Sequence, residues 1–291
     1  MILVIGKNGQ LAQAFQKYLS GEVAFWGRDK IQQIQSEILL SELRSLRPDI
    51  IINTAAYTAV DKAETEVDQA RELNVFLPTI LSQYAEESEI PLVHFSTDYV
   101  FDGSGTKPWT EDDTPHPVNI YGQTKYEGES ALLTSGAPIL LFRTSWVYSE
   151  YGNNFVKTIL KLAQEKESLR IVDDQVGSPT YACDLAQKIS EKMKDVIKNP
   201  KTLRGIYHIA GRGYISWYEF AVAIVEEAQS LGWKFKIKDI SPIASSEYKT
   251  AATRPLNSRL SQEKLHRVLG IEMPFWRDSL KQCLIEIGKN P

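Results

Sequence analysis

The sequence is poor in cysteine, in long apolar runs and in basic blocks. Its two cysteines, Cys183 and Cys283, lie too far apart for a zinc site and are too few for a disulfide framework, so reduced thiols are expected. No apolar run is long enough to span a membrane, and the start shows no basic segment followed by a long apolar stretch, as a signal peptide would. We therefore expect a cytoplasmic protein without membrane contact.

Charge of neither sign dominates. Lys and Arg number 33 against 37 Asp and Glu, for a net charge of −4. Nucleic-acid binding needs a concentrated basic surface, and no block of Lys and Arg is long enough to supply one. The hydrophobic content of 43% and charged content of 24% are typical of a globular protein. Small or nucleotide-like partners therefore remain open, whereas nucleic acid is not expected.

Short apolar runs alternate with segments of helical periodicity in the first half of the chain. The runs of strand length cover residues 2–5, 23–26, 50–53, 92–95 and 139–142, and the helical segments cover 11–19, 39–46 and 67–85. Because the strands are apolar throughout, they predict a parallel sheet that is buried on both faces. The expected fold class is α/β, with a Rossmann-like doubly wound parallel sheet.

The pattern loosens after about residue 150. A loop rich in turn residues covers 172–180, and helical segments follow at 183–197 and 216–231. We expect a dinucleotide-binding domain over residues 1–150 and a smaller, mainly substrate-binding lobe over residues 151–291. Some segments of this lobe are expected to return to the first domain.

A glycine-containing turn follows the first strand. Gly6 and Gly9 are spaced as Gly-x-x-Gly-x-x-Ala with Ala12, and Gln10 and Leu11 open the following helix. Glycines let the backbone approach a pyrophosphate closely, and the helix N-terminus offers free N–H groups to the anion. The spacing departs from the Gly-x-Gly-x-x-Gly pattern, and a purely structural turn is the alternative.

The ends of the second and third strands supply further cofactor candidates. Arg28 stands where an NAD enzyme usually presents an acid, which indicates contact with a 2′-phosphate and predicts that NADPH is accepted at least as well as NADH. A surface arginine without a role is the alternative, and Asp29 could still hold a ribose hydroxyl. After the third strand, Ala55, Ala56 and Tyr57 could let adenine and ribose lie against the backbone, unless they serve tight packing alone.

The sharpest motif is Tyr121-x-x-x-Lys125. On a helix, residues i and i+4 share a face, so the phenol and the ammonium would point into the same space. A free tyrosine has a pKa of about 10, too high for efficient proton transfer at neutral pH. A cation about 4 Å away is worth roughly 4 kcal/mol at an effective dielectric near 20, so we expect Lys125 to lower the pKa of Tyr121 by about two units.

Polar residues follow the strand at 92–95. Thr97 and Asp98 fall at the carboxyl end of this strand, where open α/β sheets bind ligands. Thr97 could hydrogen-bond a substrate carbonyl, and the alternative is capping of a turn by Ser96 and Asp98.

The four histidines form no evident catalytic or metal-ligand set. His94 and His208 fall within apolar strands and are expected to be core histidines with satisfied hydrogen bonds. An aromatic group around Trp217 and Phe220 is expected to pack in the core, with a stacking platform for thymine as the alternative.

The motifs together cover nearly the whole chain in order, at residues 6–11, 47–49, 56–64, 96–101, 121–125, 143–148, 174–180 and 254–258. This combination resembles the short-chain dehydrogenase/reductase superfamily in its extended, sugar-nucleotide branch. Within that branch it is similar to the dTDP-4-dehydrorhamnose reductase family. The full set is far more specific than any single motif.

The resemblance implies the reduction of a dTDP-linked keto-deoxysugar by NADPH or NADH. The 4-keto group of dTDP-6-deoxy-L-lyxo-4-hexulose (dTDP-4-dehydrorhamnose) would become the alcohol of dTDP-L-rhamnose. By the same resemblance, Tyr121 donates the proton, Lys125 holds the nicotinamide ribose and Thr97 contacts the substrate oxygen. The implied sugar-nucleotide contacts are Asp98, Trp146, Asn153, Gln175 and Arg254. An ion pair within the protein is the alternative for Arg254.

The sequence departs from the family pattern near the cofactor. Ala12 replaces a frequent glycine, and Arg28 with Gln32 stands where acids often contact the adenosine, which leaves the choice of cofactor open. Some members of the family form dimers around magnesium, so the resemblance also raises a homodimer and a magnesium ion. No carboxylate cluster in the sequence predicts a metal site.

Two other functions are compatible with the same motifs. One is a non-catalytic nucleotide-binding regulatory subunit of the methionine adenosyltransferase type, and the other is a sugar-nucleotide epimerase that retains and recycles its cofactor. The presence of Tyr121 and Lys125 favours an enzyme.

Overall fold

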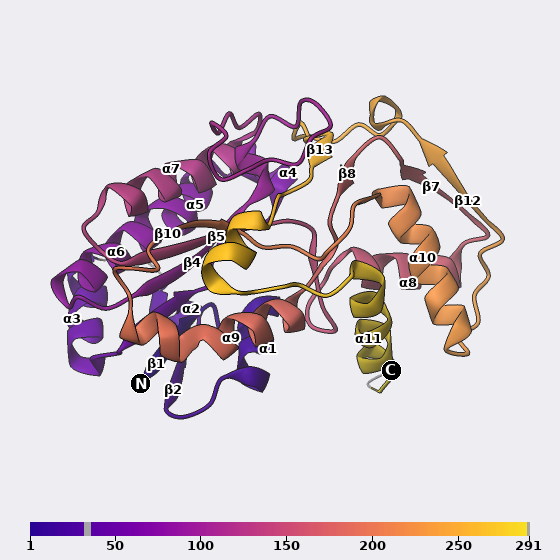
Figure 1. The fold of residues 1–291 in the computed structure, drawn as a ribbon. Coiled ribbons are helices and arrows are strands. Elements are labelled where there is room, and N and C mark those ends of the chain that lie inside the picture. Colours follow the sequence, from indigo (N-terminus) through magenta and orange to yellow (C-terminus); the bar gives the residue numbers. More distant parts are fainter. Residues whose placement is uncertain (32–35, 290–291) are drawn as a thin grey trace.

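The centre of the protein is a parallel sheet of six strands (Figure 1). The computed structural model describes residues 1–31 and 36–289, so Gln32 lies outside the described residues. The strand order is β10-β5-β4-β3-β1-β2, and every pairing is parallel. The strands are β1 (Ile2–Ile5), β2 (Val23–Trp26), β3 (Ile50–Asn53), β4 (Leu92–Thr97), β5 (Ile139–Thr144) and β10 (Gly205–His208).

The predicted doubly wound sheet is confirmed. Strands β4 and β5 each run two residues further than predicted, because Ser96 pairs with Arg143 and Thr97 with Thr144 in the ladder. The chain starts at β1, next to one edge of the sheet, moves to that edge at β2 and then crosses back past β1 to β3. This reversal of direction beside β1 is where open α/β sheets bind ligands.

Alternate strand residues enter two separate cores, one on each face of the sheet. Val4 and Ile52 belong to the first core, and Leu3 and Ile51 belong to the second. Helices α1 (Gln10–Tyr18) and α9 (Ala182–Lys198) cover the first face, and α3 (Ser36–Leu46), α6 (Leu77–Glu87) and α7 (Ile120–Thr134) cover the second. Burial of both faces explains why the strands carry apolar residues throughout.

The single helix predicted over residues 67–85 is wrong in detail. The chain forms α5 (Val67–Arg71), a π-helical turn η1 (Glu72–Phe76) and then α6. Pro78 has no N–H to donate to the Asn74 carbonyl one turn earlier, which breaks the α-helical bonding there. That carbonyl faces α7, where a Cβ atom on Gly128 would lie only 2.0 Å away.

The second half of the chain contributes to both ends of the molecule (Figure 1). The helices predicted at 183–197 and 216–231 are α9 and α10 (Trp217–Ser230), and β10 returns to the main sheet. At the far end from α3 lie α8 (Phe155–Glu165), α11 (Trp276–Lys289) and a parallel pair of strands, β7 (Ser168–Val172) and β12 (Asp239–Ile243). These four elements were not predicted.

Smaller strands and short helices connect these parts. The turn-rich loop contains β8 (Val176–Gly177), which pairs with β11 (Ile215–Ser216) and β13 (Asn257–Ser258), and β6 (Val147–Tyr148) pairs with β9 (Thr180–Tyr181). The short helices are α2 (Arg28–Ile31), α4 (Val60–Ala63), η2 (Asp98–Val100), η3 (Ser245–Glu247) and the π-turn η4 (Leu265–Leu269).

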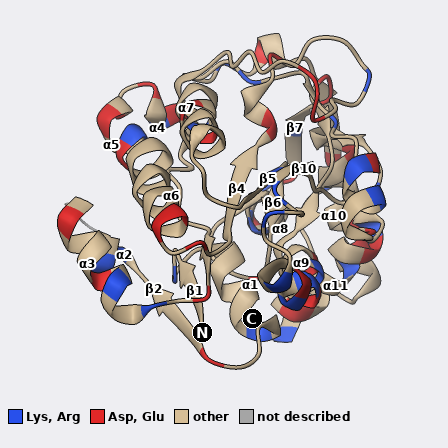
Figure 2. Ribbon diagram, turned by 60° about the vertical axis from the view of Figure 1, so that its left-hand side comes forward, with Lys and Arg blue, Asp and Glu red and all other residues tan. Residues whose placement is uncertain are grey.

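Charged residues lie mainly on the outer helices. Figure 2 shows blue and red segments mixed along α3 and α9. Within the described part of the chain, no helix has both the length and the apolar character that crossing a membrane requires.

Candidate active site

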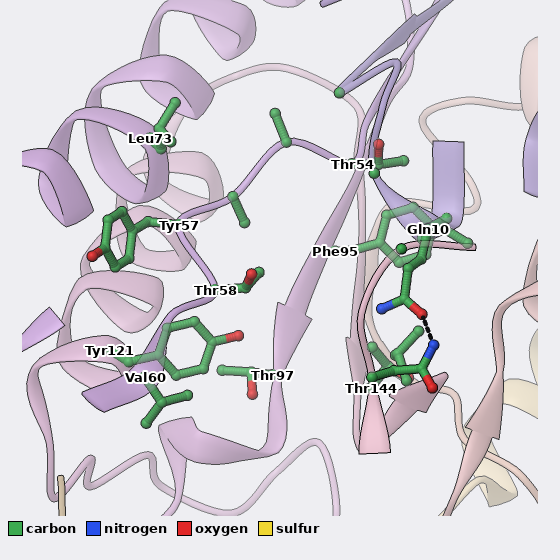
Figure 3. Close-up of a pocket in the computed structure, with 18 of the residues that line it drawn as sticks. Gln10, Thr54, Tyr57, Thr58, Val60, Leu73, Phe95, Thr97, Tyr121 and Thr144 are labelled. Carbon is green, nitrogen blue, oxygen red and sulfur yellow. Dashed lines mark hydrogen bonds between the residues drawn. The ribbon is translucent and has the colours of Figure 1, made fainter. Parts of the chain in front are cut away.

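A cavity of about 1040 Å³ opens at the carboxyl ends of β1, β3, β4 and β5 (Figure 3). It brings together most of the residues predicted from the sequence, although they come from segments far apart in the chain. Those in its lining are Gly6, Gly9, Gln10, Leu11, Arg28, Ala55, Ala56, Tyr57, Thr97, Asp98, Tyr121, Lys125, Trp146 and Asn153. The volume is ample for a dinucleotide and part of a second ligand.

The glycine turn has the geometry of a phosphate cradle. Gly6 has φ +103°, and a Cβ atom there would lie 2.6 Å from Thr54 Oγ1 and 2.9 Å from the Ala55 nitrogen. Gly9 precedes α1 without a side-chain cap, and the first turn of that helix carries no acidic residue. The N–H groups of Gly6, Lys7 and Gly9 donate to backbone carbonyls. Those of Gln10 and Leu11, at the start of α1, have no acceptor among the described residues, so they remain available to an anion and fit a dinucleotide pyrophosphate.

Two cations flank this cradle. Lys7 and Arg28 both line the cavity and are exposed, and neither forms an ion pair with another described residue. Lys7 belongs to the glycine motif but was not predicted as a contact. Its signal in the sequence was its place directly after Gly6, at the end of β1.

Tyr121 is held at the start of α7 by two specific contacts. The Asn119 side chain caps the helix by accepting from Gly122 N at 2.7 Å and donates to the Thr253 carbonyl at 2.7 Å. A Cβ atom on Gly122 would lie 2.1 Å from the Tyr99 carbonyl oxygen, so only glycine allows α7 to approach this closely. The Tyr121 and Tyr99 rings then meet edge to face, with centroids 5.5 Å apart.

The Tyr121 hydroxyl points toward Thr97 (Figure 3). Burial raises the pKa of Tyr121 above its usual value, and the hydrogen bond with Thr97 offsets this only in part. The prediction that Lys125 lowers the pKa of Tyr121 is therefore wrong for this structure. The largest cause is desolvation of the fully buried phenol, and the nearby Asp98 and Tyr99 act in the same direction, whereas Lys125 is not among the groups that shift this pKa. Tyr121 consequently carries its proton at neutral pH.

Lys125 is 2% exposed and directs its amine toward the sheet. Its Nζ donates to the Phe95 carbonyl at 2.7 Å and lies 3.3 Å from His94 Nε2. Burial lowers the pKa of Lys125 to about 8, although Glu129 acts in the opposite direction. A buried amine whose pKa lies near neutrality is typical of functional sites.

Asp98 is a buried carboxyl in the same cavity. Burial raises its pKa to about 6, whereas hydrogen bonds with Ser258 and Thr97 lower it in part. Its Oδ1 accepts from Thr97 Oγ1 at 3.1 Å, and Oδ2 has no hydrogen-bond partner among the described residues. The ionised form therefore has room to accept hydrogen bonds from a ligand.

The raised pKa predicts a stability change for Asp98→Asn. The folded protein binds a proton here up to about pH 6 and the unfolded chain only up to about pH 4, so folding loses stability as the pH rises through that window. At about pH 7.5 we expect the variant to be more stable by about 1–3 kcal/mol. Urea unfolding checks this prediction, and a gain of equal size near pH 4 would contradict it.

Trp146 and Asn153 line the cavity on the side of the second half of the chain. Trp146 adopts φ +48° and stacks on Trp217, with ring centroids 3.5 Å apart and planes 10° apart. Trp217 also lines the cavity, so this aromatic pair forms one wall.

Gln175 and Arg254 are not among the described residues that line the cavity. Gln175 is buried just before β8. Arg254 forms an ion pair with Asp61 at 2.7 Å and donates to the Tyr99 hydroxyl at 3.4 Å. Because Tyr99 does line the cavity, Arg254 lies one residue behind its wall.

His94 and His208 are both buried, but the prediction that their hydrogen bonds are satisfied is confirmed only for His94. Both His94 nitrogens have partners, whereas His208 Nδ1 lies 3.1 Å from the Trp109 carbonyl oxygen and its Nε2 has no partner among the described residues. The described residues also contain no group of three or more His, Cys, Asp or Glu side chains placed to hold a metal ion.

Comparison with known proteins gives a match over almost the full length. The model of the RmlD substrate binding domain family matches residues 1–288. A dTDP-4-dehydrorhamnose reductase of Escherichia coli (strain K12) is 39% identical over 292 residues, covering 98% of this chain and 97% of the relative.

Two solved structures are similar over the whole fold. The dTDP-4-dehydrorhamnose reductase of Bacillus anthracis, in complex with NADP, has a TM-score of 0.89 and 34% identity, with 98% of each chain covered. That of Clostridium acetobutylicum has a TM-score of 0.90 and 35% identity, with 99% of each chain covered.

Proposed function

Because the chain belongs to the dTDP-4-dehydrorhamnose reductase family, we propose that it reduces dTDP-4-dehydrorhamnose to dTDP-L-rhamnose with NADPH or NADH. The observation that carries this proposal is the shared cavity. Tyr121, Lys125 and Thr97 face the same space as the glycine turn that would hold the cofactor pyrophosphate. The proton donor Tyr121 and the glycine turn therefore line the same cavity, so a bound cofactor could contact both.

Tyr121 supplies the proton in this reaction. The reduced nicotinamide, when bound, supplies a hydride to C4 of the sugar. Tyr121 holds its proton at neutral pH because its pKa is raised, and it gives that proton to the carbonyl oxygen as negative charge develops there. The carbonyl becomes an alcohol, and the phenolate left behind regains a proton from water.

The other residues orient the reactants. Thr97 hydrogen-bonds the phenol and would also contact the substrate oxygen, which places proton and acceptor together. Lys125 would hold the nicotinamide ribose. Asp98 and Trp146 would bind the sugar, whereas Asn153, Gln175 and Arg254 would bind the nucleotide diphosphate.

The two cations beside the cradle favour NADPH. Lys7 and Arg28 lie where a 2′-phosphate of the adenosine ribose would add about two negative charges, so each would gain a partner only with NADPH. We expect Arg28→Ala to raise KM for NADPH about tenfold and KM for NADH less than twofold. Initial rates with each cofactor measure the ratio. Equal changes for both cofactors would remove the role of Arg28.

The function itself is tested by turnover. Purified protein with the dTDP-keto-sugar should oxidise NADPH, followed by the loss of absorbance of the reduced nicotinamide, and should yield dTDP-L-rhamnose. Cofactor binding without reaction would indicate the regulatory-subunit function instead. Nicotinamide that stays bound and is recycled through purification and reaction would indicate an epimerase.

Three further predictions from the sequence remain predictions. They are a cytoplasmic location, a homodimer and a magnesium ion.

A further inference from the structure

A line of hydrogen-bonded polar side chains is buried beneath the cavity and runs from the sheet to α7. His94 lies in the middle of β4 and is 1% exposed. Its Nδ1 is 3.1 Å from Nδ2 of Asn53, the residue paired with it on β3, and its Nε2 is 3.3 Å from Lys125 Nζ. Three side chains from two strands and one helix therefore form one line of hydrogen bonds that ends at the cavity.

The direction of these hydrogen bonds is fixed at the Asn53 end. The Ala55 backbone N–H donates to Asn53 Oδ1 at 3.1 Å, so the amide oxygen must face Ala55 and the NH₂ group must face the imidazole. An NH₂ group can only donate, so His94 Nδ1 must accept. Burial is the largest cause that lowers the pKa of His94 well below its usual value, so the ring is neutral. A neutral imidazole carries one proton, which must then lie on Nε2.

The Nε2–H group of His94 consequently points at Lys125 Nζ. An ammonium has no lone pair to accept this hydrogen bond, whereas an uncharged amine has one. The amine can accept from His94 and still donate to the Phe95 carbonyl oxygen, 2.7 Å away. The charged form would instead set two donors against each other in a buried site, which is costly.

We propose that Asn53 and His94 are positioning residues that direct a hydrogen bond onto Lys125 and thereby favour its uncharged amine. Resting on the proposed function, this leaves one N–H of the amine to donate to a cofactor ribose hydroxyl, because His94 takes its single lone pair and the Phe95 carbonyl takes its other N–H. The other titratable and charged groups around the pair are Glu129, which is ion-paired with Arg143 of β5, and the cavity residues Tyr121 and Asp98. Glu129 favours the charged form of Lys125, so the histidine opposes it.

The tautomer of His94 tests this proposal without any variant. Nitrogen-15 NMR of the wild-type protein, with His94 assigned by comparison with His94→Phe, distinguishes a bare from a protonated ring nitrogen. We expect the Nε2–H tautomer. A proton on Nδ1 would overturn the proposal, since the ring would then present a lone pair to Lys125.

Asn53→Asp is expected to reverse the direction of the hydrogen bonds that link residue 53, His94 and Lys125, with almost no change in the shape of the side chain. A carboxylate can only accept, from Ala55 N–H and from His94 Nδ1, so the His94 proton must move to Nδ1 and Nε2 must accept from Lys125. We expect the pKa that governs NADPH affinity to rise by about one unit or more, a tenfold change in proton affinity. An unchanged pH profile of NADPH binding would overturn the proposal.

The charge that Asn53→Asp adds is controlled by making the same change in a His94→Phe background. In that background the substitution still introduces a carboxylate, but no imidazole links it to Lys125. We therefore expect a smaller shift of the pKa that governs NADPH affinity. Equal shifts in both backgrounds would overturn the proposal. NMR and NADPH binding need no sugar substrate, so a wild-type protein that fails to reduce the dTDP-keto-sugar would count against the proposed function alone.

Discussion

Replacement of Tyr121 by phenylalanine is expected to lower kcat by about 10²–10⁴-fold, the usual effect of losing a positioned acid. The hydroxyl is the only group removed, and the ring keeps its edge-to-face contact with Tyr99. The dissociation constant for NADPH and the midpoint of thermal unfolding should therefore change little. Steady-state kinetics, cofactor titration and calorimetry measure the three quantities.

Tyr126→Phe is the matched control for this variant. Tyr126 lies on the same helix α7 but packs against a cluster around Phe101 and does not line the cavity. It should keep wild-type kcat. A loss of less than about threefold in Tyr121→Phe would contradict the role of this phenol as the proton donor.

Replacement of Lys125 by methionine is expected to damage cofactor binding and turnover together. Methionine fills a similar volume at this position of the cavity lining but removes the amine that donates to the Phe95 carbonyl. Loss of a hydrogen bond of about 1.5–3 kcal/mol should weaken NADPH binding by about 10–100-fold. We also expect kcat to fall about 10²-fold, because the ribose loses its contact with Lys125 and the nicotinamide is no longer held in position.

The matched control is the same substitution at Lys194, an exposed residue of α9, which tests for effects of losing one positive charge and for effects on protein expression. Lys194→Met should leave both constants unchanged. If Lys125→Met lowered kcat while NADPH affinity stayed at the wild-type value, Lys125 would not hold the cofactor as proposed.

The local pattern of the sequence was sufficient to predict five of the six strands of the sheet and a ligand site at their carboxyl ends, but not β10. Each predicted strand is present because an apolar run buried on both faces can form little else at that length. The glycine turn, Thr97 and the helix with Tyr121 then meet at the carboxyl edge, where parallel strands all end. Their convergence follows from topology, so it could be predicted without coordinates.

Features that depend on contacts between distant segments could not be predicted. The π-helical turn at η1 requires both Pro78 and the approach of Gly128, fifty residues later in the chain. The pKa of Tyr121 was predicted in the wrong direction, because spacing on a helix shows which residues share a face but not how deeply that face is buried. His94 was expected to be a satisfied core histidine, and it is, but its partner Lys125 lies 31 residues away.

The most direct test of the account follows hydrogen from the cofactor to the sugar. Wild-type protein is incubated with dTDP-4-dehydrorhamnose and NADPH that carries deuterium at both C4 positions of the nicotinamide, and the product is analysed by NMR and mass spectrometry. The account predicts one deuterium at C4 of dTDP-L-rhamnose and release of one NADP⁺ per sugar. Product without deuterium at that carbon, or no product while the cofactor remains bound, would contradict it.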